Sequence, residues 1–143
     1  MRIVVAVDPG VHKGYAILDL QTGLIHAGVE LTYVGLYAVF KQAQPDVIVI
    51  EHFDTTMSLT SDMLHTIECI GAVAGWCEQH RVTMFRQRPS QRKAFSPLAE
   101  QLVRVKPRVL HLEDATAHAL RYAYAELHYD VETIQAKLPT GNS

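Results

Sequence analysis

The chain has 143 residues, of which 48% are hydrophobic and 20% are charged, and its net charge is −2. This length and composition predict one globular domain with its own core, over residues 1–129, and a C-terminal tail over 130–143. No apolar run is long enough to span a membrane, and Met-Arg followed by a strand pattern does not resemble a signal peptide. Cys69 and Cys77 lie about two turns apart in one predicted helix and cannot bridge each other there. We therefore expect reduced thiols in a cytoplasmic protein.

Residues 3–31 predict three strands joined by turns. Ile3 to Val7 is a β-branched run without polar alternation, which is typical of a strand buried on both faces, and Asp8 ends it. A turn with two glycines and a second apolar run follow as far as Asp19, and residues 24–31 form the third strand. The segment predicts a meander with one carboxylate at the end of its first strand.

A helical pattern over residues 33–44 separates this meander from a fourth strand, Val47 to Ile50. A helix in this place is a crossover connection, which lets the fourth strand run parallel to the first and lie beside it. The fourth strand ends in Glu51, so we expect Asp8 and Glu51 to lie side by side at one edge of the sheet. Open α/β sheets bind their ligands at this kind of edge.

The second half of the chain predicts two long helices and one more strand. A helix begins at its N-cap Ser61 and runs to about residue 79, and residues 82–85 form the fifth strand. The last helix runs from about His111 to His128, and the tail from Asp130 is expected to fray. The predicted fold class is α/β: a five-stranded mixed sheet flanked by helices, with strands one to three antiparallel and strands four and five parallel to strand one.

Residues 86–107 form a basic segment that prolines interrupt, with a short helix expected from Pro89. Seven basic residues and one acid, Glu100, lie between Arg86 and Arg108. This charge pattern fits a phosphate-binding surface, and it fits a solvated basic loop equally well. The candidates for contacts with nucleic acid are Lys13, Phe53, Arg88, Arg92, Lys93, Arg104 and Lys106.

The last helix adds candidate metal ligands to the two carboxylates at the sheet edge. His111, Asp114 and His118 are spaced i, i+3 and i+7, which places them on one helix face. If this face meets Asp8 and Glu51, hard oxygen ligands gather at one point, and such ligands suit Mg²⁺ or Mn²⁺. Two such ions can activate a water and stabilise the leaving oxygen of a phosphodiester.

Each of these residues also has an ordinary structural explanation. Asp8 before Pro-Gly can cap a turn, Glu51 can be a solvated strand end, and Asp114 can be a first-turn acid favoured by the helix dipole. A lone histidine is most often a surface residue. The convergence of all of them on one place favours a metal-dependent nuclease.

Three segments resemble motifs of the RuvC-type Holliday junction resolvases of the RNase H-like superfamily, and especially the small members found in bacteriophages. These segments are VAVDPGVHKGYAILD, DVIVIEHF and HLEDATAHAL. RPSQRKAF is similar to the segment in which the family carries a basic DNA-contacting residue, and Lys93 is the best candidate for it. ECIGAVAGW resembles the helix through which the family dimerises. The resemblance covers residues 2–129.

The resemblance implies a nuclease that resolves four-way DNA junctions by paired symmetric nicks. It implies Asp8, Glu51, His111 and Asp114 as catalytic and metal-binding residues, with His118 as a helper base or an outer group. It also implies two Mg²⁺ ions with Mn²⁺ as a substitute, a homodimer, and a place in the cytoplasm of a bacterial or phage-infected cell. The products would carry a 5′-phosphate and a 3′-hydroxyl.

Three other hypotheses compete with this one. A nuclease of the same fold could act on other branched DNA or on RNA-containing duplexes, and a binding module could recognise junctions without cutting them. A nucleotide-binding domain of the sugar-kinase and actin type shares the Asp-Gly turn, but it needs a second domain for which this chain is too short. Phe53 could insert into a junction or pack in the core.

Overall fold

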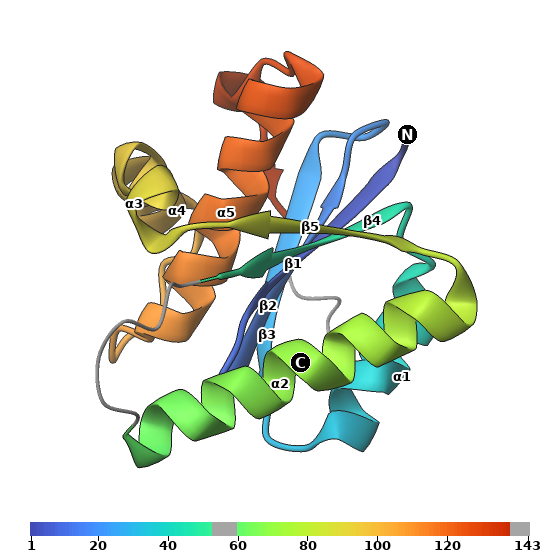
Figure 1. The fold of residues 1–143 in the computed structure, drawn as a ribbon. Coiled ribbons are helices and arrows are strands. Elements are labelled where there is room, and N and C mark those ends of the chain that lie inside the picture. Colours follow the sequence, from blue (N-terminus) through green and yellow to red (C-terminus); the bar gives the residue numbers. More distant parts are fainter. Residues whose placement is uncertain (53–59, 138–143) are drawn as a thin grey trace, which may run out of the picture.

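The computed structural model describes residues 1–52 and 60–137. Its centre is a mixed sheet with the strand order β5–β4–β1–β2–β3–β6 (Figure 1). The strands are β1 (Ile3–Asp8), β2 (Lys13–Asp19), β3 (Leu24–Glu30), β4 (Val47–Glu51), β5 (Thr83–Gln87) and β6 (Gln135–Ala136). The helices are α1 (Tyr33–Ala43), α2 (Ser61–His80), α3 (Pro89–Arg92), α4 (Ser96–Leu102) and α5 (Leu110–Leu127), with 3₁₀ turns η1 (Lys93–Phe95) and η2 (Val131–Thr133).

The strand directions confirm the predicted topology. β1, β2 and β3 form an antiparallel meander. β4 runs parallel to β1, and β5 runs parallel to β4. α1 provides the crossover between β3 and β4, as its position in the sequence predicted.

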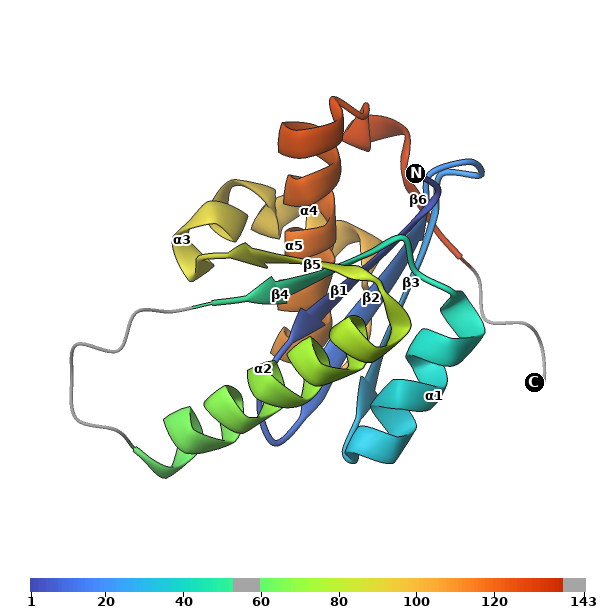
Figure 2. The ribbon, with the colours of Figure 1, turned by 45° about the vertical axis from the view of Figure 1, so that its right-hand side comes forward.

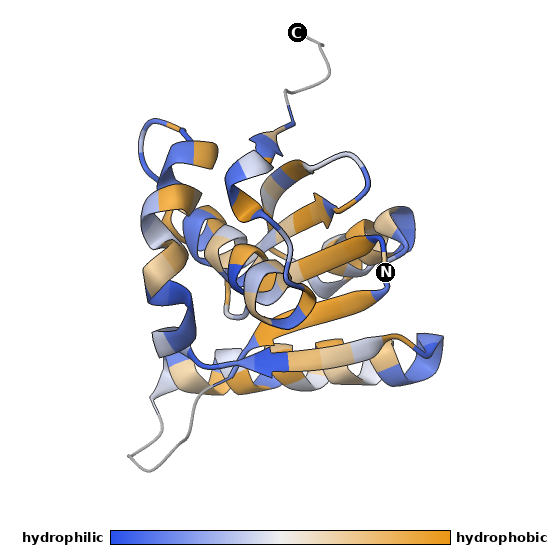
Figure 3. Cartoon of the chain, turned by 90° about the horizontal axis from the view of Figure 1, so that it is seen from above, coloured by the Kyte–Doolittle hydropathy of each residue, from blue (hydrophilic) through white to orange (hydrophobic). Residues whose placement is uncertain are grey.

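Helices cover both faces of the sheet, which explains why β1 has no polar alternation. Val4 and Ala6 pack in the core beneath α5, whereas Val5 and Val7 pack in the core beneath α1 and α2. Figure 2 shows α1 and α2 on one face and α5 with α3 and α4 on the other. The strands between them are mostly apolar (Figure 3). Each fully buried Val or Leu contributes about 1.5–3 kcal/mol, so the two cores hold the central strands firmly in place.

Threonine side chains cap the N-termini of the two helices on one face. Thr32 accepts a hydrogen bond from the Gly35 N–H, and Thr60 accepts one from the Met63 N–H. The cap of α2 is thus one residue before the predicted Ser61. Both cysteines of α2 are buried and free, in agreement with the expectation of reduced thiols. No helix in the described parts of the chain is both long and apolar enough to cross a membrane.

The structure differs from the predicted elements in three places. Residues 130–137 do not fray, because η2 and a sixth strand, β6, follow Asp130, and β6 pairs in parallel with β3. β5 continues two residues beyond the predicted strand, to Gln87. A further helix, α4, lies within the basic segment after the predicted short helix α3.

Candidate active site

The carboxyl ends of three neighbouring strands form one edge of the site. In the register of β1 and β4, Val7 lies opposite Ile50, so Asp8 and Glu51 follow side by side, as predicted. Glu51 in turn lies opposite Gln87 of β5. The sheet therefore places two carboxylates and one amide at the same edge.

Helix α5 brings the remaining polar groups to this edge. Buried alanines such as Ala115 and Ala119 let the helix lie close to the sheet. Its first turn comes closest at Gly14 of β2, where an added Cβ would overlap the carbonyl group of His111 and lie 3.0 Å from its Cβ. Gly14 therefore determines how near His111 can come to Asp8.

Replacing Gly14 with Ala is expected to push the start of α5 away from β2. The overlap with His111 should lower the free energy of unfolding by about 1–3 kcal/mol, the usual cost of overpacking, or more because the contact is with backbone atoms. It should also lower any catalytic activity by displacing His111. Thermal unfolding measured beside activity checks both effects, and an unchanged unfolding midpoint would contradict the close approach.

Asp8 is the most strongly perturbed carboxyl group of the site. The residue is 6% exposed, and Oδ2 lies 2.8 Å from Nδ1 of His111. Burial raises its pKa to about 7; the hydrogen bond with His111 opposes this rise, and the charges of Glu51 and Asp114 add to it. Asp8, Glu51 and Asp114 are therefore close enough to repel one another when ionised.

Glu51 is held by two donors on the same oxygen. Arg92 Nε lies 3.0 Å and His118 Nε2 lies 3.1 Å from Oε1 of Glu51. Burial alone would raise the pKa of Glu51, but its interactions with His118 and, after these, with Arg92 outweigh burial and lower the pKa. Arg92 Nη1 also lies 3.5 Å from Oδ1 of Asp114. The pKa of Asp114 is nevertheless raised, because burial outweighs this neighbouring charge.

These contacts determine how the site fits a metal. Within residues 1–52 and 60–137, no three His, Cys, Asp or Glu side chains are already gathered in a metal-binding arrangement. Arg92 instead pairs with two of the carboxylates and supplies the positive charge that they need. By donor type, the three mutually repelling carboxylates and the one histidine suit Mg²⁺ or Mn²⁺.

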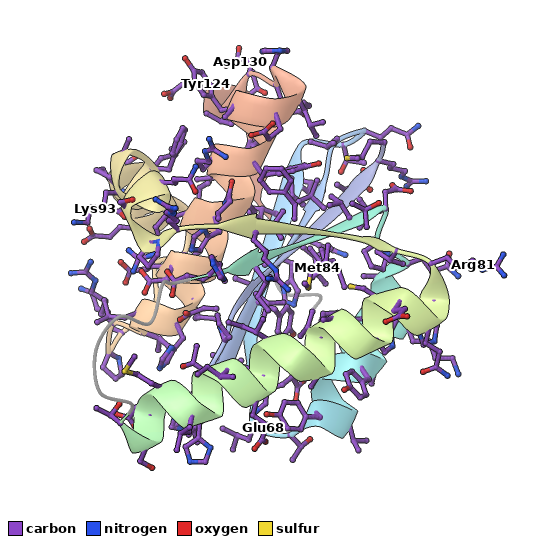
Figure 4. All side chains as sticks on the ribbon, viewed as in Figure 1. Glu68, Arg81, Met84, Lys93, Tyr124 and Asp130 are labelled. Carbon is purple, nitrogen blue, oxygen red and sulfur yellow. The ribbon has the colours of Figure 1, made fainter. Side chains whose placement is uncertain are left out.

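The predicted nucleic-acid contacts lie in four different environments, of which buried Lys13 is the last. Arg88, Lys93, Arg104 and Lys106 are exposed, and Lys93 lies on the outer side of the α3–α4 segment (Figure 4). Arg104 and Lys106 line a groove of about 740 Å³ beside the start of α5. Arg92 lies inside the carboxylate cluster instead of on a free basic surface. Phe53 lies outside the described residues.

Lys13, a predicted DNA contact, has its partners inside the protein. Its side chain is 5% exposed, and Nζ donates to the carbonyl oxygens of Val11 at 3.1 Å and Leu31 at 3.3 Å. The ammonium group also lies 4.5 Å from the centre of the Tyr33 ring. These partners satisfy the charge within the protein, so Lys13 stabilises the turns beside the site.

Two groups near the site were not predicted from the sequence. Gln87 is fully buried and bonds to His118, although its neighbours in the RQRPS run suggest a polar loop. Glu113 is buried and forms a two-oxygen pair with Arg108, whose Nε lies 2.9 Å from Oε1 and 2.7 Å from Oε2. A strand pattern extended to Gln87 was the one signal that could have placed the first of them.

No protein-family model and no curated protein sequence matches the chain. Solved structures do match it. T. thermophilus RuvC in complex with a Holliday junction substrate is 19% identical with a TM-score of 0.69, and the match covers 89% of this chain and 96% of that chain. A second Thermus thermophilus RuvC structure is 20% identical with a TM-score of 0.68, and the match covers 89% of this chain and 97% of that chain. The Fowlpox virus resolvase in complex with its substrate Holliday junction DNA is 15% identical with a TM-score of 0.58, and the match covers 87% of this chain and 99% of that chain. The chain thus has the RNase H-like α/β fold that RuvC has.

Proposed function

We propose that the protein is a metal-dependent DNA endonuclease that resolves four-way junctions by paired symmetric nicks. The observation that carries the proposal is the meeting of Asp8, Glu51 and Asp114 at the carboxyl edge of the sheet. The fold adds support, because the structures that it resembles include two resolvases in complex with Holliday junction DNA.

The residues of the cluster have distinct roles in this proposal. Asp8, Glu51, Asp114 and His111 would hold two Mg²⁺ ions, with Mn²⁺ as a substitute, and these ions would supply an activated water and charge stabilisation at the phosphate. His111 contacts Asp8 through Nδ1 while its side chain stays 45% exposed, so its ring is open to solvent and to a substrate. His118 is fully buried and has no such access to solvent.

The exposed basic side chains would hold the DNA backbone on either side of the cluster. Arg88 follows β5 directly and Lys93 follows α3, whereas Arg104 and Lys106 line the groove beside the start of α5. Such contacts position a duplex without reading its bases, and they release counterions, so binding should weaken steeply with salt. This arrangement fits recognition of DNA shape more than of sequence.

A homodimer would match the two-fold symmetry of a four-way junction. The outer face of α2 carries Leu64 and Ile67, which are 54% and 41% exposed. Gly71 and Gly75 are exposed on the same helix, and an added Cβ at either would meet nothing within 4 Å. Neither glycine packs against another described part of the chain, and we propose that both allow close contact between two copies of α2.

Replacing both Gly71 and Gly75 with Ala is expected to weaken self-association at least about tenfold without lowering helix content. Alanine favours the helix by up to about 1 kcal/mol per site, but its methyl groups would hold two copies of α2 apart. Sedimentation at several protein concentrations measures the association, and circular dichroism measures the helix. A wild-type chain that stays monomeric up to high concentration would contradict the dimer.

Competition between substrates tests the proposed function. Unlabelled four-way junction, flap, plain duplex and RNA–DNA duplex are each added to a reaction that contains a labelled junction and Mg²⁺. We expect the junction to compete far better than the others. Equal competition by flaps or by RNA–DNA duplex would favour the other nuclease of the same fold, and binding of the junction without cleavage would favour a recognition module. We also propose that the protein is most similar to the small bacteriophage resolvases and that it acts in the cytoplasm of a bacterial or phage-infected cell.

A further inference from the structure

A continuous chain of hydrogen bonds leads from the cluster through the interior to the surface. Glu51 Oε1 lies 3.1 Å from Nε2 of His118, and Nδ1 of the same ring lies 2.9 Å from Nε2 of Gln87. Gln87 Nε2 also donates to the carbonyl oxygen of His118 at 3.0 Å. Arg121 Nη1 donates to Oε1 of Gln87 at 3.0 Å and lies 3.2 Å from Oε1 of Glu126.

The chemistry of these groups allows one direction for the chain. A guanidinium only donates, so the amide oxygen of Gln87 must face Arg121 and the amide nitrogen must face His118. An amide nitrogen also only donates, so Nδ1 of His118 must accept. The proton of the ring is then on Nε2, from which it is donated to Oε1 of Glu51. Arg121 and the carbonyl oxygen of His118 both hold the amide in this orientation, and the amide thereby determines which nitrogen of His118 faces Glu51 as a donor.

We infer that Gln87 and Arg121 are positioning residues that make His118 a fixed donor to Glu51. Gln87 and His118 are both fully buried, and Nδ1 is occupied by Gln87, so His118 acts on the carboxylate and not as a base toward water. Its bond and that of Arg92 both fall on Oε1 of Glu51, which fixes the plane of the carboxylate. The catalytic meaning of this inference rests on the proposed function, because Glu51 matters only if it serves the reaction.

A purely structural role explains these residues less well. A buried amide and a buried imidazole cost desolvation free energy that apolar side chains of similar size would avoid. Their hydrogen bonds compensate this cost, but nothing in the packing of β5 against α5 demands polar groups there. Groups that orient a metal-binding side chain from behind have a measurable effect: their loss lowers metal affinity or activity by about 10–100-fold.

Nitrogen NMR of the histidine rings tests the hydrogen-bond direction in the metal-free, full-length protein. Two-bond proton–nitrogen correlations show which ring nitrogen carries the proton, and the His118 signals are identified by their loss in His118→Asn. We expect a protonated Nε2 and a bare Nδ1 in the wild type. In Arg121→Met the amide of Gln87 keeps the carbonyl oxygen of His118 as its one orienting partner, so the Nε2-protonated ring should stay the main form and a minor form with the proton on Nδ1 should appear. A wild type with its proton on Nδ1 would overturn the inference.

Gln87→Met tests the positioning role, with the exposed Gln21→Met as matched control. Mn²⁺ affinity, measured by electron paramagnetic resonance without DNA, and kcat for junction cleavage should each fall by about 10–100-fold in Gln87→Met and stay unchanged in the control. Arg121→Met serves the same purpose if Gln87→Met does not fold. Changes below about twofold would overturn the role. A wild type that binds Mn²⁺ but cuts no junction would refute the proposed function and leave this inference standing, whereas a wild type that does neither would refute both.

Discussion

Replacing Asp8 with Asn is expected to abolish junction cleavage and to raise the stability of the metal-free protein at pH 8. Burial raises the pKa of Asp8 from 3.8 to about 7, against the opposing hydrogen bond with His111. The folded protein therefore keeps a proton that the unfolded chain has already released, and ionising Asp8 in the fold costs free energy. Asparagine carries no charge and removes this cost together with the metal ligand.

The gain in stability has a pH window that follows from these values. It is absent below about pH 4, where Asp8 is protonated in both states, grows between pH 4 and 7, and is complete above pH 7. Since one pKa unit corresponds to about 1.4 kcal/mol, the gain has an upper bound of about 4 kcal/mol. Thermal unfolding in EDTA should show a large gain at pH 8 and a much smaller one at pH 5. Cleavage in Mg²⁺ should fall by at least about 10²–10³-fold.

Asp19→Asn is the matched control, because it makes the same chemical substitution and is expected to change the stability at pH 8 in the opposite direction. Partial burial of Asp19 is outweighed by hydrogen bonds from Arg2, Gln21 and Thr22, so its pKa is lowered. Its ionised form stabilises the fold above its unfolded pKa, and the variant should lose stability at pH 8 while it keeps its activity. If Asp8→Asn also lost stability at pH 8 in EDTA, the account of a repelling, buried carboxylate cluster would be wrong.

Replacing Arg92 with Met is expected to lower stability in EDTA and to strengthen metal binding. The guanidinium pairs with Glu51 and Asp114, so its loss leaves those carboxylates uncompensated. Breaking a buried ion pair costs about 3–5 kcal/mol, and about 2 kcal/mol is expected here because the Arg92 side chain is 20% exposed. A divalent ion would no longer compete with the guanidinium, and its affinity should rise about tenfold, equivalent to about 1.4 kcal/mol.

Mn²⁺ titration and unfolding with and without Mn²⁺ measure both effects. Arg92→Lys keeps the positive charge and should lie between the wild type and Arg92→Met. The original prediction, a contact between Arg92 and a DNA phosphate, leads to a different result. In that case Arg92→Met would weaken junction binding in EDTA and leave the affinity for Mn²⁺ unchanged.

The meeting of Asp8 and Glu51 was predictable from the sequence because it depends on short-range signals. Two unbroken apolar runs gave the buried strands, the helix between them required a crossover, and each run ended in a carboxylate. The spacing of His111, Asp114 and His118 placed them on one face of α5. On this face His118 contacts Glu51, and Asp114 contacts Arg92, which also pairs with Glu51. Local patterns and one topological rule were sufficient for this part.

The other features depend on contacts between distant segments, which residue patterns do not encode. Arg92 is one of several basic residues in a run, and its place in the cluster follows from the position of α3 beside α5. Lys13 is buried because Leu31, from a different turn, offers it a carbonyl oxygen. β6 consists of two residues and exists only through its pairing with β3. Gln87 looks like a loop residue in the sequence, and only the pairing of β5 with β4 shows that it belongs to a strand.

Cleavage of an end-labelled four-way junction and of a matched duplex tests the central claim most directly. Wild type and Asp8→Asn are each incubated with Mg²⁺, Mn²⁺ or EDTA, and the cut strands are mapped. The account predicts paired symmetric nicks in the junction alone, which either metal supports and which EDTA and the substitution each abolish. Junction cleavage that persists in EDTA or in Asp8→Asn, or equal cutting of the duplex, would contradict it.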